Sequence, residues 1–166
     1  VMVETSPRLS RVQQETLGPV AGRVVWSRSV DDLPRGPLLI VGNELFDAIP
    51  IRQYVKAGPR WQERVVGLDD AGALSFLAGA GSLDAAWLPP RAAGASDGEI
   101  VELAPARTAL MTGIAERIAA DNGVALFFDY GYVEPAVGDS LQALSNHAFA
   151  DPLAEPGKAD LTAHVD

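Results

Sequence analysis

Two short runs made only of apolar residues constrain the fold of this chain most strongly. They are residues 38–41 (Leu-Leu-Ile-Val) and 124–128 (Val-Ala-Leu-Phe-Phe). Runs of this length without polar alternation are typical of parallel strands buried on both faces. Residues 104–122, directly before the second run, carry apolar residues at helical spacing and are followed by Gly123. This order of strand, helix and strand predicts an α/β fold with a doubly wound sheet.

The N-terminal part fits the same plan. Residues 1–3 are an apolar strand candidate, and Ser6 with Pro7 forms an N-cap and first position that predict a helix of about three turns. Gly18-Pro19 ends this helix, and residues 23–27 form a second short β-type run. The first part therefore reads β-α-β before the apolar run at 38–41.

The middle of the chain has a different pattern. Residues 51–57 and 61–68 alternate as strands do, and Gly58-Pro59 between them predicts an antiparallel hairpin. Residues 74–77 are a candidate third strand, residues 100–103 a further short strand, and residues 79–98 are expected to be mostly loop. The region 51–103 thus interrupts the α/β plan as an insertion.

The end of the chain is expected to be loop and short strands from Gly131 onward. Asp160 has the character of an N-cap, which predicts a helix beginning there and still incomplete at Asp166. Together with the strand that residues 1–3 begin, this suggests a chain cut at both ends.

Composition excludes several functional classes. The formal net charge is −9, which disfavours proteins that coat nucleic-acid phosphates. The absence of cysteine removes disulfides, thiol nucleophiles and cysteine-bound zinc, and no apolar run is long enough for a transmembrane helix. Because no signal peptide is visible, the cytoplasm is the default compartment, with an organelle lumen as the alternative.

The charge is unevenly distributed along the chain. Residues 1–67 have a net charge of +2, whereas residues 68–166 have a net charge of −11. This asymmetry has two interpretations, a solvated acidic surface or a face that attracts a basic partner.

Acidic side chains follow each of the apolar strand candidates. Glu4 follows the first, the segment 43–50 follows the second, and Asp129 follows the third. Ligands of open α/β sheets bind at the carboxyl ends of the strands, where one carboxylate can accept hydrogen bonds from both hydroxyls of a ribose. For Glu4 the alternative is a solvated residue beside a helix start.

The segment after the second strand is the most informative. It places Asn43, Glu44 and Asp47 close together, and one helical turn over residues 45–48 would put the two carboxylates on the same side. Such a pair can bind a guanidinium group. In the alternative interpretation, Asp47 caps a turn and Phe46 fills the core.

Other candidate motifs carry less weight. Residues 79–81 (Gly-Ala-Gly) lack the third glycine and the helix of a dinucleotide loop, and Ser82 and Ser140 lack a nucleophile-elbow frame. His147 and His164 are interpreted as packing or capping residues, so no metal site is expected.

The segment 42–54 (GNELFDAIPIRQY) resembles the N-E-[FL]-F-D-A-[LI]-P signature of the MidA-type methyltransferases, relatives of a mitochondrial complex I assembly factor that methylates arginine. Further blocks resemble the family in the same order, at residues 3–9, 125–132, 138–143 and 151–166. The resemblance implies a Rossmann-like methyltransferase fold. It also implies that residues 1–166 are one partial domain, lacking the first strand and Gly-rich loop, with residues 51–103 inserted on the substrate side.

The resemblance further implies S-adenosylmethionine as cofactor and roles for six residues. The implied catalytic residues are Asn43, Glu44 and Asp47; the implied cofactor-binding residues are Glu4, for the ribose, with Asn43 and Asp129; the implied substrate-binding residues are Glu44, Asp47 and Tyr130. Because the Gly-rich loop is missing, this chain alone is expected to bind the cofactor poorly and to be inactive. In the inserted hairpin, Arg52 and Trp61 are candidates for substrate contact, with packing as the alternative for Trp61.

The expected function is methylation of arginine in a protein substrate, in support of respiratory complex I assembly, with a complex I subunit as a candidate substrate and a bacterial cytoplasmic location. The second interpretation is a non-catalytic assembly factor that uses a methyltransferase-like fold for binding. A third, a nucleotide-binding dehydrogenase, shares Glu4 but leaves the segment 43–50 unexplained.

Overall fold

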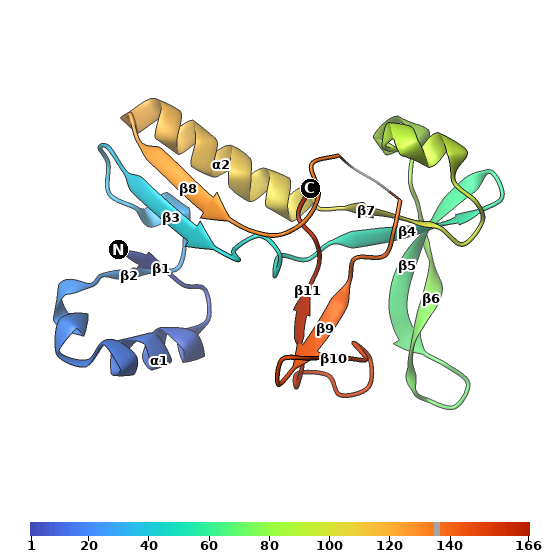
Figure 1. Ribbon diagram of the computed structural model, residues 1–166, viewed down its shortest axis with the longest axis horizontal. Coiled ribbons are helices and arrows are strands. Elements are labelled where there is room, and N and C mark those ends of the chain that lie inside the picture. Colours follow the sequence, from blue (N-terminus) through green and yellow to red (C-terminus); the bar gives the residue numbers. More distant parts are fainter. Residues whose placement is uncertain (135–136) are drawn as a thin grey trace. The chain divides into compact units, whose positions relative to one another are not determined.

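The computed structural model describes residues 1–134 and 137–166 (Figure 1). The chain forms two compact units. The first comprises Val1–Ile40 and Leu110–Ala125, and the second comprises Val41–Ala109 and Leu126–Asp166.

In the first unit, β1 (Met2–Val3) pairs in parallel with β2 (Trp26–Ser27), and α1 (Pro7–Leu17) connects them. The predicted helix start is confirmed, because the Ser6 side chain accepts a hydrogen bond from the Leu9 amide. The predicted second strand is shorter than expected, since a 3-10 helix occupies Gly18–Arg23. The predicted β-α-β order of residues 1–27 is therefore confirmed, with a shorter second strand.

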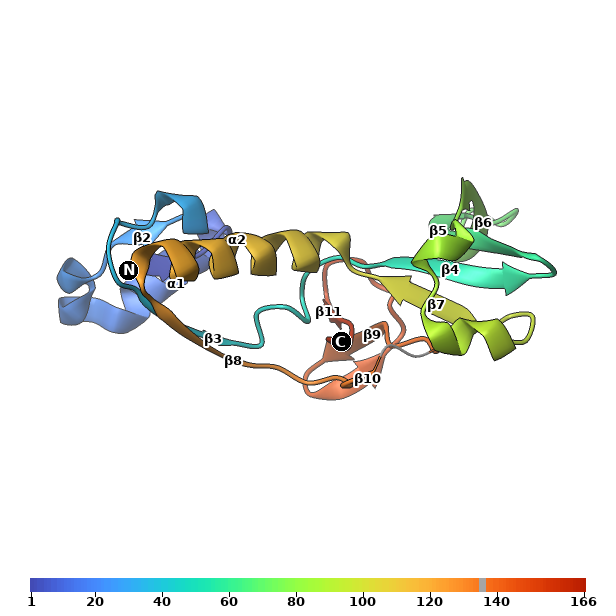
Figure 2. The same ribbon diagram turned by 90° about the horizontal axis from the view of Figure 1, so that it is seen from above.

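The two apolar runs form β3 (Leu39–Asn43) and β8 (Val124–Phe128), which are hydrogen-bonded neighbours. The Val124 amide donates to the Leu38 carbonyl at 2.8 Å, and the Glu44 amide donates to the Phe128 carbonyl at 2.8 Å. Partners thus advance along both strands together, so the strands run parallel as predicted, and Figure 2 shows them side by side.

The prediction that these strands are buried on both faces is wrong for the chain as described. Every second residue is exposed, with Leu39 at 88% and Val41 at 74% of their full accessibility. Both faces of this two-stranded ribbon are apolar, and the neighbouring segments cover only one of them. The helix predicted between them is confirmed as α2 (Pro105–Asp121). Of the apolar residues at helical spacing, Leu110, Ile114 and Ile118, only Ile114 is fully buried.

The second unit contains a four-stranded antiparallel sheet in the order β6-β5-β4-β7. Its strands are β4 (Arg52–Ala57), β5 (Arg60–Leu68), β6 (Leu74–Ser82) and β7 (Ile100–Leu103). The predicted hairpin is confirmed, with Gly58 at a φ of 57° in its turn.

The third strand of this sheet is longer than predicted. Residues 79–82 continue β6 instead of beginning a loop, and two 3-10 helices, Ala85–Trp87 and Pro90–Gly94, follow. Glycine fits here because a β-carbon on Gly79 would lie 2.8 Å from Cγ1 of Val65. The absence of a side chain, which looked like loop composition, allows close packing between two strands.

The core of this sheet supports the packing interpretation of Trp61. Trp61 is 5% exposed and clusters with Tyr54, Ala92 and Val101. Arg52, by contrast, has an exposed side chain that pairs with Glu63 at 3.2 Å.

The C-terminal residues form a three-stranded antiparallel sheet in the order β10-β9-β11. Its strands are β9 (Gln142–Ser145), β10 (Ala148–Ala150) and β11 (Asp160–Thr162). The predicted helix from Asp160 is therefore wrong, because Leu161 pairs with Ala143 in a ladder that the local sequence does not reveal. None of the helices formed by the described residues has the length and apolar character needed to span a membrane.

Candidate functional site

The segment 43–50, called the acidic loop here, leaves β3 without forming the predicted helical turn. Glu44 adopts a left-handed conformation with φ at 48°, and the hydrogen-bonded turn that follows joins the Ile49 amide to the Phe46 carbonyl. The prediction that a helical turn puts Glu44 and Asp47 on the same side is therefore wrong. Asn43 and Glu44 are exposed, whereas Asp47 is only 5% exposed.

Phe46 fills the core, as the alternative interpretation of the acidic loop predicted. It is 7% exposed and meets Phe127 edge to face, with ring centroids 5.2 Å apart. Gly42 makes room for this pair, because a β-carbon there would lie 2.6 Å from the ring of Phe127. The aromatic contact thus fixes the acidic loop against β8.

Asp129 ties the ends of β3 and β8 together. Its Oδ2 accepts a hydrogen bond of 2.8 Å from the Phe46 amide, and its Oδ1 accepts one of 3.1 Å from the Tyr130 amide. A half-buried carboxylate with two amide donors is a fixed negative group. The expected meeting of acidic residues at one strand edge is thus present for the acidic loop and Asp129.

Tyr130 lies beside the acidic loop and the C-terminal strand. Its hydroxyl donates to Oγ1 of Thr162 at 2.7 Å. Burial raises the pKa of the Tyr130 phenol, the hydrogen bond to Thr162 opposes this rise, and the nearby Asp47 carboxylate raises the pKa further. Its ring packs edge to face with His164 at 5.6 Å, which confirms a packing role for that histidine.

Two residues of this site were missed by the sequence analysis. Thr162 is buried under Tyr130, and the buried guanidinium of Arg107 binds backbone carbonyls. Its acceptors are Asp47 O at 3.2 Å, Ala163 O at 2.8 Å and His164 O at 2.5 Å. Arg107 carried one visible signal, a cation in the first turn of a helix, where the macrodipole disfavours it.

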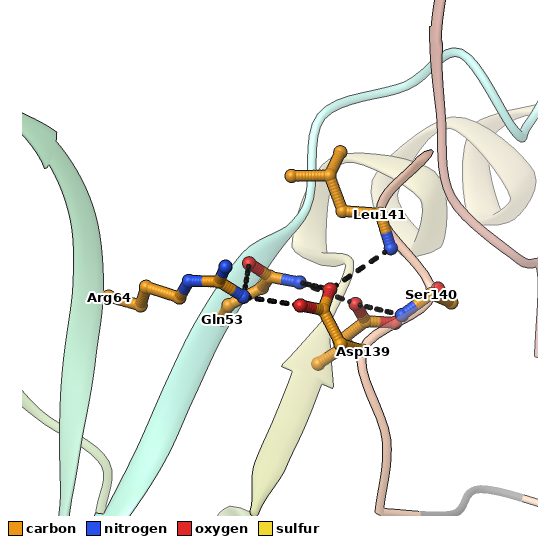
Figure 3. A network of polar contacts seen from close by, with 6 residues as sticks. Gln53, Arg64, Asp139, Ser140 and Leu141 are labelled. Atoms are coloured by element: carbon orange, nitrogen blue, oxygen red, sulfur yellow. Dashed lines mark hydrogen bonds and ion pairs between the residues drawn. The ribbon is translucent and has the colours of Figure 1, made fainter. Parts of the chain in front are cut away.

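A second polar network joins the four-stranded sheet to the segment 139–141 (Figure 3). Asp139 accepts hydrogen bonds from Nε2 of Gln53 at 2.8 Å and from Arg64 at 2.6 Å. The Ser140 hydroxyl donates to Glu102, so it is committed to a structural contact. This agrees with the interpretation that Ser140 is not a hydrolase nucleophile.

Glu4 lies in the first unit, directly after β1, and its carboxylate is held in place. Oε1 accepts from the Ser6 amide at 2.8 Å, and Oε2 accepts from Nε2 of Gln13 at 3.1 Å. Gln13 is itself fixed by the indole of Trp26, which donates to its Oε1 at 2.9 Å. Each carboxylate oxygen keeps a second lone pair, so Glu4 can still accept two hydroxyl hydrogen bonds.

Comparison with known proteins agrees with the α/β character of the fold. Residues 1–166 match the family described as putative S-adenosyl-L-methionine-dependent methyltransferase. The chain is 37% identical over 145 residues to a mitochondrial protein named protein arginine methyltransferase NDUFAF7 homolog from Caenorhabditis elegans, covering 86% of this chain and 34% of that protein. It is 30% identical to protein arginine methyltransferase NDUFAF7 of Danio rerio, covering 99% of this chain and 43% of that protein.

Solved structures show the same similarity. A likely methyltransferase of the COG1565 superfamily from Burkholderia thailandensis, bound to S-adenosyl-homocysteine, matches with a TM-score of 0.78 and 32% identity. The match covers 99% of this chain and 44% of that one, so the chain spans less than half the length of these relatives. On the match of its whole length, the chain belongs to the family of putative S-adenosyl-L-methionine-dependent methyltransferases.

Proposed function

We propose that this chain is part of a methyltransferase that transfers the methyl group of S-adenosylmethionine to arginine in a protein substrate. The observation that carries the proposal is the group of carboxylates at the joined ends of the parallel strands β3 and β8. Asp129 fixes the acidic loop there, and Asp47 lies buried within it. The names of the relatives and the S-adenosyl-homocysteine bound to the Burkholderia structure support this chemistry.

The proposed function also assigns the strands to two parts, a methyltransferase domain and an insertion. The parallel strand pairs β1–β2 and β3–β8 belong to a Rossmann-like methyltransferase domain of which residues 1–166 are a part. Residues 51–103 are an insertion that faces the protein substrate. The parallel pairing of β3 with β8 and the antiparallel pairing of β4 with β5 support this division.

The proposed cofactor contacts come from Glu4, Asn43 and Asp129. The carboxylate of Glu4 fits a ribose because it is fixed by Ser6 and Gln13 and still has lone pairs for two hydroxyls. When bound, S-adenosylmethionine supplies a methyl group made reactive by its sulfonium. Asn43 and Asp129 offer an amide and a carboxylate at the ends of the two central strands.

The proposed acceptor contacts come from Glu44, Asp47 and Tyr130. A guanidinium has a pKa above about 12, so a carboxylate cannot remove its proton in advance. The exposed Glu44 and the buried Asp47 accept hydrogen bonds from the guanidinium and orient one nitrogen toward the methyl group. As the bond between this nitrogen and the methyl carbon forms and the bond between that carbon and the sulfonium sulfur breaks, the nitrogen loses a proton, and the carboxylates stabilise the cation while the proton leaves. The Tyr130 hydroxyl is protonated at neutral pH, because its pKa lies above the ordinary value of 10.0, so it adds a polar contact without a charge.

The test uses the full-length protein, S-adenosylmethionine with a tritiated methyl group, and an extract of source cells that lack the gene. We expect labelled methylarginine after acid hydrolysis of the acceptor protein. Glu44→Gln and Asp47→Asn are expected to lower the rate by about 10-fold or more, because each removes one charged hydrogen bond to the acceptor. Glu116→Gln, which neutralises an exposed carboxylate on α2, is the matched control and should leave the rate unchanged.

The second candidate function is a non-catalytic assembly factor. The exposed apolar residues Val66 and Leu68, near the end of the β5–β6 hairpin, favour a protein-binding role. A protein that binds its partner without incorporating label would support this function and contradict the first. Under either function we propose a protein partner, with a respiratory complex I subunit as the candidate, and a bacterial cytoplasmic location.

A further inference from the structure

We propose that Arg107 is a positioning residue that fixes the acidic loop for methyl transfer by binding the backbone of Asp47. This inference rests on the proposed function for its catalytic consequence and on the contacts of Arg107 for its structural part. Arg107 itself is not expected to touch the cofactor or the acceptor, because its guanidinium is buried and turned to main-chain oxygens.

The contacts of Arg107 join segments that are far apart in the sequence. One terminal nitrogen donates to the carbonyls of Asp47 and Ala163 at 3.2 Å and 2.8 Å, and the other donates to the carbonyl of His164 at 2.5 Å. The guanidinium therefore bridges the acidic loop and the residues directly after β11. We call these three hydrogen bonds the Arg107 clamp.

The carbonyl of Asp47 is the point on which the acidic loop is held. It accepts one hydrogen bond from Arg107 and a second, of 3.0 Å, from the amide of Ala163. Both of its lone pairs are thus engaged. With the peptide group fixed in this way, the Asp47 side chain, beside Tyr130, has a defined direction.

The stability of the fold does not by itself explain an arginine at this position. The side chain is 8% exposed, its charge stands in the first turn of α2 against the helix dipole, and its acceptors are neutral carbonyls. Within residues 1–134 and 137–166, its Nε has no hydrogen-bond partner, as is also true of Arg117, but Arg107 has no ion-pair partner either. A site that breaks several local rules at once is typical of a functional position.

Arg117, on the same helix, shows what a structural arginine of this chain looks like. It also donates to backbone carbonyls, those of Leu33 and Pro34, at 2.8 Å and 2.5 Å. Unlike Arg107, it has a carboxylate partner, Asp121, at 2.7 Å one helical turn away. These contacts lie within the first unit, so Arg117 is a matched control.

The structural part is tested by hydrogen exchange and mass spectrometry on the full-length protein. In Arg107→Met we expect amide exchange to accelerate about 10- to 100-fold over residues 44–50 and 160–165, as loss of charged hydrogen bonds implies. The paired strands β4 and β5 should keep their protection, which excludes general unfolding. Arg107→Lys, which retains the charge with fewer donors, should restore part of the protection, and Arg117→Met should leave both segments unchanged.

The catalytic part is tested by steady-state methylation of the same extract with S-adenosylmethionine that carries a tritiated methyl group. Arg107→Met should lower kcat about 10-fold or more with the KM for S-adenosylmethionine unchanged, and Arg107→Lys should recover part of kcat. Unchanged exchange over residues 44–50 in Arg107→Met would overturn the clamp, whether or not the wild type methylates arginine. Accelerated exchange with full kcat would overturn the positioning role, while an inactive wild type would overturn the proposed function and the catalytic role with it.

Discussion

Replacing Gly131 by alanine tests the contact that holds the C-terminal residues against the site. Gly131 follows Asp129 and Tyr130 and forms an isolated parallel bridge with Val165. A β-carbon on Gly131 would lie 1.8 Å from the carbonyl oxygen of Val165 and 2.6 Å from its nitrogen. Since these atoms belong to the backbone, the two segments must separate by about 1 Å or more to admit a methyl group.

The separation has an energetic consequence that follows from the bonds at this bridge. The amide of Val165 donates to the Tyr130 carbonyl and the amide of Tyr132 donates to the Val165 carbonyl, both at 3.0 Å. Losing two such bonds costs about 1 kcal/mol each, and overpacking adds about 1–3 kcal/mol. We therefore expect Gly131→Ala to lower the free energy of unfolding by about 3–5 kcal/mol, for the unit that contains the site.

The assay is urea unfolding followed by circular dichroism. With a urea dependence of about 1–3 kcal/mol per molar, a loss of about 3–5 kcal/mol lowers the urea midpoint by roughly 1 M or more. Gly113→Ala is the control, because Gly113 lies within α2 with nothing within 4 Å of the position that an alanine methyl group would take, and alanine there should stabilise by about 1 kcal/mol. A Gly131→Ala protein as stable as the wild type would show that the close contact of Gly131 with the Val165 backbone does not contribute to stability.

Two further predictions concern the same site. Because the pKa of Tyr130 is raised in the folded protein, its stabilising contribution is complete below the ordinary value of 10.0 and is lost as the pH rises through the raised value. Tyr130→Phe should therefore lose less stability in alkaline urea titrations than the wild type, and an equal loss would contradict the shift. Asp129→Ala should leave the Phe46 amide without its acceptor and lower the free energy of unfolding by about 1–3 kcal/mol, with faster exchange of that amide; unchanged exchange would count against Asp129 as the tie between the strands.

The elements that the sequence predicted well are those with strong local signals. Ser6 and Pro7 define the start of α1, and the apolar runs define β3 and β8 because few other elements are so short and so apolar. The hairpin of β4 and β5 follows from strand alternation on both sides of Gly58. In each case the information lies within about ten residues.

The elements that the sequence misassigned depend on partners far along the chain. Asp160 resembles a helix N-cap, yet Leu161 pairs with Ala143 in a β-ladder. The glycines of residues 79–82 resemble a loop, yet Gly79 makes room for the side chain of Val65 and Gly81 for that of Glu63 on the neighbouring strand β5. Tertiary pairing overrides local propensity at such positions.

The sequence predicted which residue types follow β3 and β8, but not how deeply these residues are buried or which partners hold them. The carboxylates after β3 and β8 could be found because strand ends carry ligands in α/β sheets, but the depth of Asp47 could not. Its carbonyl accepts hydrogen bonds from Arg107 and Ala163, which lie 60 and 116 residues away in the sequence. Thr162, the partner of Tyr130, was hidden for the same reason.

Calorimetric titration of S-adenosyl-homocysteine into the full-length protein tests the central claim, the division between a cofactor carboxylate and acceptor carboxylates, most directly. We expect Glu4→Gln to weaken binding about 10-fold, because a charged acceptor of the ribose hydroxyls is lost, and Glu44→Gln to leave the affinity within about 2-fold of the wild type. Wild-type affinity in Glu4→Gln would contradict that division, and so would a loss of about 10-fold in Glu44→Gln.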